Sequence, residues 1–337
     1  GEPIRLLSES VLNGTILMIL ATCIVSTFAT QRGAHNIAVK NALQTNDEEK
    51  SRPEEHILIP VANEQSVDEL VGLSATIKRA KEPNGLYALH AIDNRVDDPN
   101  MEKRARKLLD MAAQAAASAD NYMQQLLRYD VNIANAIVST VRERNITDIV
   151  LGMHQRPPGS TALPAIPGIP GIPGTSGPGI GKMVTDVLSQ SNVTTFIYSP
   201  AQPLSTIKRH LVIVPPGAEK EAGFQMWLQR IHQLARNTGA KVAFFASDAT
   251  LQHIRPRRER KAPANIGFVP FDRWDDLPSL EHDLRDDDCL WFVMSRRDRV
   301  SYHPAMSRIP GYLEQVFAGY SAVLVYPVQA GATDRYL

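Results

Sequence analysis

The chain has 337 residues, in which 36 lysines and arginines are balanced by 36 aspartates and glutamates. A formal net charge of zero excludes a general electrostatic attraction to nucleic acid, and the length allows two domains of ordinary size. Cys23 and Cys289 lie far apart in the sequence, which excludes a disulfide framework and fits a reducing compartment.

Residues 11–29 form a run without a charged side chain. At about 1.5 Å per helical residue this run matches the roughly 30 Å hydrocarbon core of a bilayer, so we predict one transmembrane helix within a membrane segment at 1–40. Small and hydroxyl residues in the run leave a buried or interfacial helix open, whereas Glu2 and Glu9 before it disfavour a signal peptide. Arg32 and Lys40 after it place the C-terminal side in the cytoplasm.

After a charged linker at 41–54, strands and helices are expected to alternate. Short apolar runs rich in β-branched residues predict strands, and apolar residues at helical spacing predict helices. The predicted strands are 56–62, 86–92, 148–152 and 194–198, and the predicted helices are 67–80, 101–127 and 131–144. This alternation is typical of an α/β fold, with helices on both faces of a parallel sheet.

The same pattern begins again in the second half. Strands are predicted at 211–214, 241–247, 290–294 and 322–326, with a helix at 225–237. Each half closes with an apolar strand followed by proline. We therefore predict tandem related α/β domains at 55–202 and 207–330. A Gly/Pro-rich stretch at 156–181 is typical of an extended loop, with a lid or a partner-docking segment as alternatives.

The first half contains a candidate anion-binding arrangement. Its fourth predicted strand ends in glycine, and a later Gly-Lys pair opens a helix. Glycine lets backbone N–H groups approach a phosphate, the start of a helix carries partial positive charge, and lysine adds a point charge. His90, at the end of the second strand, would edge the same cleft. With Gly152, Met153, Gly181 and Lys182 it makes up the candidate anion-binding residues.

This arrangement resembles the universal stress protein family, whose domains are five-stranded, Rossmann-like α/β nucleotide-binding folds. Gly152 matches the first glycine of the family's glycine-x-x-glycine turn, but Gln155 stands at the second, and Lys182 stands where a hydroxyl residue belongs. The resemblance implies that all these candidates are nucleotide-binding and adds Val61, Ala62 and Asn63 at the end of the first strand, but that strand lacks the aspartate that commonly ends it in the family. The resemblance implies ATP or another adenine nucleotide as cofactor. The departures leave a scaffold without nucleotide as the alternative.

The second half departs further from the family. Residues 295–304, at the equivalent of the glycine turn, contain no glycine. A nucleotide cannot approach that backbone in the same manner. The three arginines there leave open an anion site, a contact with a partner domain, or a solvated loop.

The whole arrangement, an apolar helix followed by two such domains, resembles the C-terminal region of a bacterial monovalent cation:proton (Na+/H+) antiporter. Residues 12–17 and 22–23 resemble the end of the membrane part, and residues 301–304 and 326–327 resemble the end of the second cytoplasmic domain. The resemblance implies a non-enzymatic regulatory domain at the inner membrane that faces the cytoplasm. Its implied partners are the membrane transport domain of the same protein, the lipid bilayer and a second copy in a homodimer.

Two other function classes stay open. One is a membrane-anchored stress protein that binds ATP, and the other is a purely structural dimerisation module. The histidines show no metal-ligand spacing, and no Walker-type loop or nucleophile elbow occurs in the sequence. The basic run at 255–261 leaves open a contact with acidic lipids, pairing with the acidic stretch at 272–288, or a solvated run.

Overall fold

The computed structural model describes residue 18 and residues 54–79, 84–95, 98–153, 181–255, 265–297 and 299–329. The chain divides into two compact units, Gly1–Glu54 and Glu55–Leu337. Apart from Met18 and Gly181, the predicted membrane helix at 11–29 and the Gly/Pro-rich stretch at 156–181 lie outside the described residues. Among the described helices, none combines the length and the apolar character that crossing a bilayer requires.

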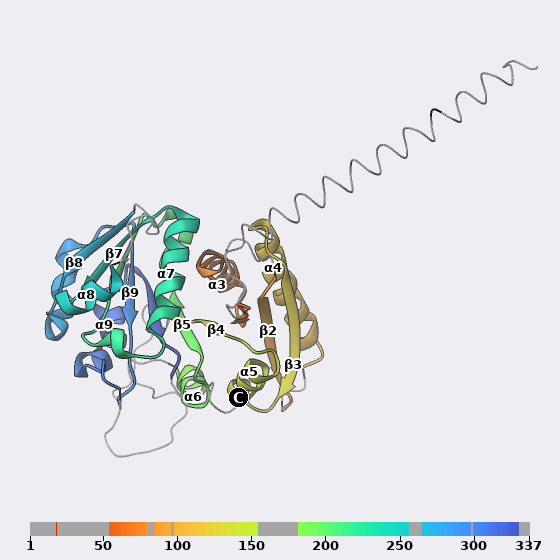
Figure 1. Ribbon diagram of the computed structural model, residues 1–337. Coiled ribbons are helices and arrows are strands. Elements are labelled where there is room, and N and C mark those ends of the chain that lie inside the picture. The colour runs from red at the N-terminus through yellow and green to blue at the C-terminus, as the bar shows by residue number, and fades with distance from the viewer. Residues whose placement is uncertain are drawn as a thin grey trace, which may run out of the picture. The chain divides into compact units, whose positions relative to one another are not determined.

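The second unit is built on a single sheet, whose described strands run in the order β3-β2-β1-β4-β5-β10-β9-β6-β7-β8. In the first half, the helices and strands are β1 (Ile57–Pro60), α3 (Glu64–Ile77), β2 (Leu86–Asp93), α4 (Met101–Ser118), β3 (Met123–Asp130), α5 (Ile133–Glu143), β4 (Asp148–Gly152), α6 (Lys182–Gln190) and β5 (Thr194–Ser199). Figure 1 shows the path of the chain through these elements.

The second half repeats this alternation with shorter helices. After the 3-10 turn η1 (Leu204–Thr206), its elements are β6 (Arg209–Ile213), η2 (Ala218–Lys220), α7 (Phe224–Thr238), β7 (Lys241–Ala246), α8 (Asp248–Ile254), β8 (Ile266–Pro270), η4 (Trp274–Asp283), β9 (Asp288–Val293), η5 (Pro304–Arg308), α9 (Ile309–Gln315) and β10 (Ser321–Tyr326). The labels η mark 3-10 helices.

The strand order shows an internal repeat. The first half has the order β3-β2-β1-β4-β5, and the second half has the matching order β8-β7-β6-β9-β10. Strands within each half pair in parallel, whereas β5 and β10 join the halves antiparallel, with Ile197 opposite Leu324. The predicted α/β class and its two related five-stranded halves are therefore confirmed. The domain bounds 55–202 and 207–330 stay predictions.

Helices cover both faces of this sheet, which explains why its central strands are apolar throughout. Buried residues of α3, α4, α7 and α8 pack on one face, and those of α5, α6, η4 and α9 pack on the other. Parallel sheets of this kind are buried on both sides. α3 and α7 contact each other across the junction between the halves, and Figure 1 shows them side by side.

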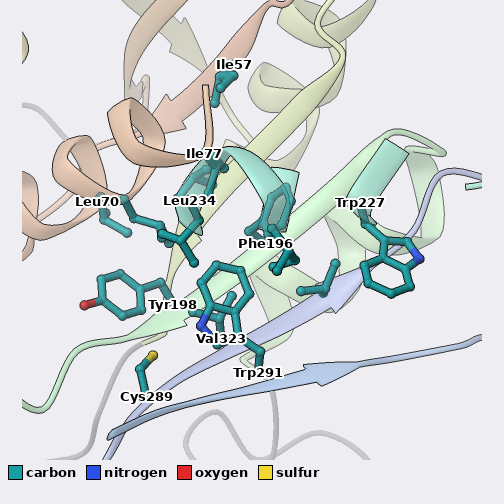
Figure 2. Close-up of a cluster of buried hydrophobic side chains, with 14 of the residues drawn as sticks. Ile57, Leu70, Ile77, Phe196, Tyr198, Trp227, Leu234, Cys289, Trp291 and Val323 are labelled. Atoms are coloured by element: carbon teal, nitrogen blue, oxygen red, sulfur yellow. The ribbon is translucent and has the colours of Figure 1, made fainter. Parts of the chain in front are cut away.

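Large side chains from both halves meet at the central strands (Figure 2). Phe196 on β5 packs edge-on against Trp291 on β9, with 6.2 Å between ring centroids. The Trp291 Nε1–H donates to Nδ1 of His210 at 3.1 Å, so the neutral His210 ring carries its proton on Nε2. Burial lowers the pKa of His210 to about 4. The junction is therefore a packed core in which the buried His210 ring stays uncharged.

Two strands were missed from the sequence, and one predicted helix is too long. The helix predicted at 101–127 is wrong beyond Ser118, because Asp120 has a φ of 54° and the Asn121 N–H returns to the Ala116 carbonyl at 3.0 Å. These contacts end α4, and β3 follows. β3 and β8 are the two edge strands, and their residues are largely exposed or half-buried. Neither strand therefore has the continuous apolar run by which a central strand is predicted.

Candidate functional site

The candidate residues at the ends of β1 and β2 are joined by hydrogen bonds. The Val61 N–H donates to the Leu89 carbonyl at 2.8 Å, which extends the pairing of β1 and β2 by one residue. Nδ1 of His90 lies 2.7 Å from the Val61 carbonyl. Because a carbonyl only accepts, this nitrogen carries the proton, and Nε2 of the neutral ring is left as the acceptor. Val61 therefore fixes the tautomer of His90.

Asn63 has a structural role as the N-cap of α3. Its side-chain oxygen accepts the Gln65 N–H at 3.0 Å, and its carbonyl accepts both the N–H and the hydroxyl of Ser66. Asparagine is among the favoured capping residues because its side chain replaces a missing helical acceptor. Ala62 and Asn63 are both exposed at this edge. They could border a ligand, but the Asn63 side-chain oxygen already serves the helix.

Gly152 and Met153 lie at the end of β4, beside β1 in the sheet. A Cβ on Gly152 would stand 3.4 Å from Leu70 Cδ1, so α3 already covers this glycine closely. The Met153 N–H donates to the Tyr198 carbonyl at 2.7 Å. Because this N–H continues the pairing of β4 with β5, it is not available to bind an anion in this conformation.

Gly181 and Lys182 start α6 and are both exposed. Nothing stands within 4 Å of a Cβ built on Gly181, so its space does not require glycine. The first N–H groups of a helix have no acceptor within the helix, and they carry partial positive charge. Together with the Lys182 ammonium, they form the part of the candidate site best suited to an anion.

The topology brings the candidates to one edge of the sheet. In a parallel α/β fold, the segments that leave the carboxyl ends of neighbouring strands share an edge, and α6 starts on the way from β4 to β5. Val61 and His90 touch directly, whereas no described contact joins Lys182 to the other candidates. Two surface hollows of about 780 and 420 Å³ lie along α4, and none of the eight candidates lines them.

A buried charge network was missed by the sequence analysis. Arg230, on α7 of the second half, holds Asp148 at the start of β4 with Nε to Oδ1 at 3.1 Å and a second, shorter contact. It also pairs with Glu55, just before β1, and Glu55 pairs with Arg79. Arg230, Asp148 and Glu55 are all at most 6% exposed. We name these four residues the Arg230 network.

The Arg230 network keeps the Glu55 carboxylate ionised inside the protein. Burial alone would raise the pKa of Glu55, but Arg230 and Arg79 outweigh burial and lower it. Burial would likewise lower the pKa of Arg230, but Asp148 and Glu55 raise it. The Thr147 hydroxyl also donates to Asp148 Oδ2 at 2.6 Å. Arg230 therefore ties the second half to two strands of the first.

A second polar contact between the halves lies around the turn between α6 and β5. Arg296, one of the three arginines singled out in the sequence, donates from Nη2 to the Ser191 carbonyl at 2.9 Å. The Gln329 N–H donates to the Asn192 carbonyl at 3.0 Å. The part of the arginine-rich segment that is described therefore includes a contact with the other domain.

No group of three or more histidine, cysteine, aspartate or glutamate residues that could hold a metal ion occurs among the described residues. Cys289 is buried and free, and burial raises the pKa of its thiol. Neither feature adds a ligand or a nucleophile to the edge that the candidate residues share.

Part of the sequence is similar to a known antiporter. No established family model matches the chain. The Na(+)/H(+) antiporter NhaS5 of Synechocystis is 31% identical over 178 residues, which cover 47% of this chain and 25% of the antiporter. The chain thus spans about a quarter of the length of this relative. It has partial homology to that antiporter.

Solved structures are similar in fold. The cytoplasmic domain of a prokaryotic cation chloride cotransporter matches with a TM-score of 0.52 at 11% identity, covering 83% of this chain and 97% of that one. A universal stress protein from Archaeoglobus fulgidus matches with a TM-score of 0.48 at 12% identity, covering 81% and 96%. Likeness at such low identity concerns the fold alone. The chain combines partial homology to an antiporter with an α/β fold also found in a transporter's cytoplasmic domain.

Proposed function

We propose that the chain is a cytoplasmic, universal-stress-protein-like regulatory region of a monovalent cation:proton antiporter and neither transports nor catalyses by itself. The partial homology to an Na(+)/H(+) antiporter carries this proposal. The fold agrees with it, because a similar α/β domain forms the cytoplasmic part of another cation transporter. The proposed location is the inner membrane, with residues 55–337 in the cytoplasm.

The finer proposal is that the first half senses an adenine nucleotide. Support comes from the exposed start of α6, where helical N–H groups and Lys182 offer positive charge, and from the exposed Ala62 and Asn63 at the same edge. His90 adds an acceptor nitrogen suited to an amino or hydroxyl group of a ligand. Because the Met153 N–H is already bonded, weak binding is expected.

The contacts between the halves suggest how a ligand would act. α6 begins at the candidate site and ends beside Ser191, whose carbonyl accepts from Arg296 of the second half. A ligand that shifts α6 would therefore change this contact. It could bias the antiporter only by the difference between its affinities for the two arrangements.

Transport in membrane vesicles tests the regulatory role. The complete antiporter that contains this chain is compared with a form that lacks residues 55–337, by the change in ΔpH on adding Na+ or K+. We expect both forms to exchange cations for protons, with a different rate or pH dependence after the deletion. Identical behaviour, or cation flux from this chain alone in proteoliposomes, contradicts the proposal.

Calorimetry with Mg-ATP on the chain tests nucleotide sensing. We expect weak binding that Lys182→Glu abolishes, because this exposed change reverses the charge without affecting the core. Absence of binding would favour the scaffold function, and tight binding with turnover would favour a stress protein acting as an ATPase. The homodimer also stays a proposal, and light scattering of residues 55–337 measures it.

A further inference from the structure

The second half has an edge equivalent to the candidate site, and its residues can be matched through equivalent hydrogen bonds. The Val214 N–H donates to the Phe245 carbonyl at 2.9 Å, as Val61 does to Leu89. The Met294 N–H donates to the Val325 carbonyl at 2.8 Å, as Met153 does to Tyr198. The edge after Val214 and Met294 is therefore the counterpart of the edge after Val61 and Met153.

The chain itself covers this counterpart. Gly217, in the turn after β6, has a φ of 79°, and a Cβ there would stand 3.5 Å from Val300 Cγ1 and 3.6 Å from the Val300 carbonyl oxygen. Ser301, the next residue, is only 3% exposed. Residues 299–301, which we name the covering segment, thus lie across the turn after β6.

A carboxylate fastens the covering segment. Oε1 of Glu221, which follows η2, accepts the Ser301 hydroxyl at 2.9 Å and the Ser301 N–H at 3.2 Å. Residues on either side of the segment have further hydrogen bonds. Arg296 bonds to the first half, and the His303 ring accepts the Ala305 N–H at 3.2 Å as the cap of η5.

Two carboxylates lie at the covered edge. Glu219 and Glu221 flank the turn after β6, and Glu219 accepts the Thr250 hydroxyl at 2.9 Å. A ligand would reach this edge only after displacing the covering segment, which Glu221 holds through Ser301.

We propose that the covering segment takes the place of a ligand in the second half, so that the chain binds a single phosphate-bearing ligand, at the first half. The part concerning the first half rests on the proposed function. The closure by Glu221 and Ser301 is independent of it. The structure thus assigns the two related halves different roles, one open to an anion and one closed by the protein's own backbone.

Amide hydrogen exchange on the whole chain tests the closure without any ligand. Glu221→Ala removes the acceptor of the Ser301 N–H, and we expect exchange at residues 299–302 to accelerate by about tenfold or more, as for loss of a hydrogen bond to a charged group. Glu219→Ala is the matched control, since Glu219 does not contact the segment, and exchange there should stay unchanged. Unchanged exchange in Glu221→Ala overturns the closure.

Equilibrium dialysis with Mg-ATP tests the stoichiometry. We expect one ATP per chain, lost with Lys182→Glu and retained with Glu221→Ala. Two ATP per chain, or one that survives Lys182→Glu, overturns the proposal. If no ATP binds, nucleotide sensing and the open first site both fail, and the exchange experiment alone decides whether Glu221 closes the second half.

Discussion

Asp148 and Asp288 are equivalent residues with different partners. Each opens the fourth strand of its half, and each is fully buried. Asp288 pairs with Arg209 of its own half, whose side chain is 23% exposed, whereas Asp148 pairs with Arg230 of the other half, whose side chain is 7% exposed. The same strand start thus neutralises its charge locally in one half and uses it to join the halves in the other.

The largest effect is expected where the pair crosses between the halves. Arg230→Met keeps an apolar side chain of similar length but leaves Asp148 and Glu55 buried without their shared cation. We expect the free energy of unfolding to fall by about 3–5 kcal/mol, measured by urea denaturation. Gln229→Met, on the exposed face of the same helix, should change it by less than about 0.5 kcal/mol. Equal losses in the two variants would refute the bridging role.

A glycine beside the Arg230 network gives the next effect. Gly85 has a φ of 104°, and a Cβ there would stand 2.1 Å from the Glu55 carbonyl oxygen. We expect Gly85→Ala to cost about 3 kcal/mol in unfolding free energy, because strained conformation and backbone clash combine. Gly239→Ala is the control: its φ is 69°, but nothing stands within 4 Å, so it should cost about 1 kcal/mol. A larger loss for Gly239→Ala than for Gly85→Ala would contradict the close packing of Gly85 against the Glu55 carbonyl.

The local pair should matter less. Arg209→Met removes the cation from Asp288, but the Arg285 N–H still donates to Asp288 Oδ2 at 2.8 Å, and the Arg209 side chain is itself 23% exposed. We expect a loss of about 1.5 kcal/mol in unfolding free energy. A loss as large as that of Arg230→Met would mean that the pair between the halves stabilises the protein no more than the pair within one half.

The smallest effect concerns pH and the central core. His210 is buried with its pKa lowered to about 4, so below pH 6.5 the unfolded chain takes up a proton that the folded chain refuses. Stability therefore falls as the pH falls from 6.5 to 4, and between pH 7 and 6 this histidine contributes a loss of about 0.7 kcal/mol. His210→Gln should flatten this part of the urea-midpoint profile. An unchanged profile would show that the ring is protonated in the folded state.

The central strands could be predicted from sequence because burial on both faces demands continuous apolar runs, as in β4, β9 and β10. The edge strand β3 could not, since its exposed Gln124 and Gln125 continue an alanine-rich helix without a break in polarity. A left-handed Asp120 makes the boundary, and aspartate signals that conformation only weakly.

At the candidate site, the strand ends could be predicted from the sequence, whereas their hydrogen bonds could not. Strand ends at Val61 and Gly152 follow from the apolar runs, whereas the commitment of the Met153 N–H to Tyr198 depends on the pairing of β4 with β5. Arg230 left one signal in the sequence. It lies three residues after Trp227 and four before Leu234, on an apolar helix face where a charge needs a buried partner. The partner itself comes from a distant strand, so sequence alone does not name it.

Because β5 and β10 pair antiparallel, the strands of the two halves run in opposite directions. Loops that finish the strands of the first half emerge on one rim of the sheet, and their counterparts in the second half emerge on the opposite rim. A small molecule that arrives at one rim leaves the other rim free for a protein surface. A ligand-binding surface and a protein-binding surface could therefore occupy opposite rims of one sheet without overlapping.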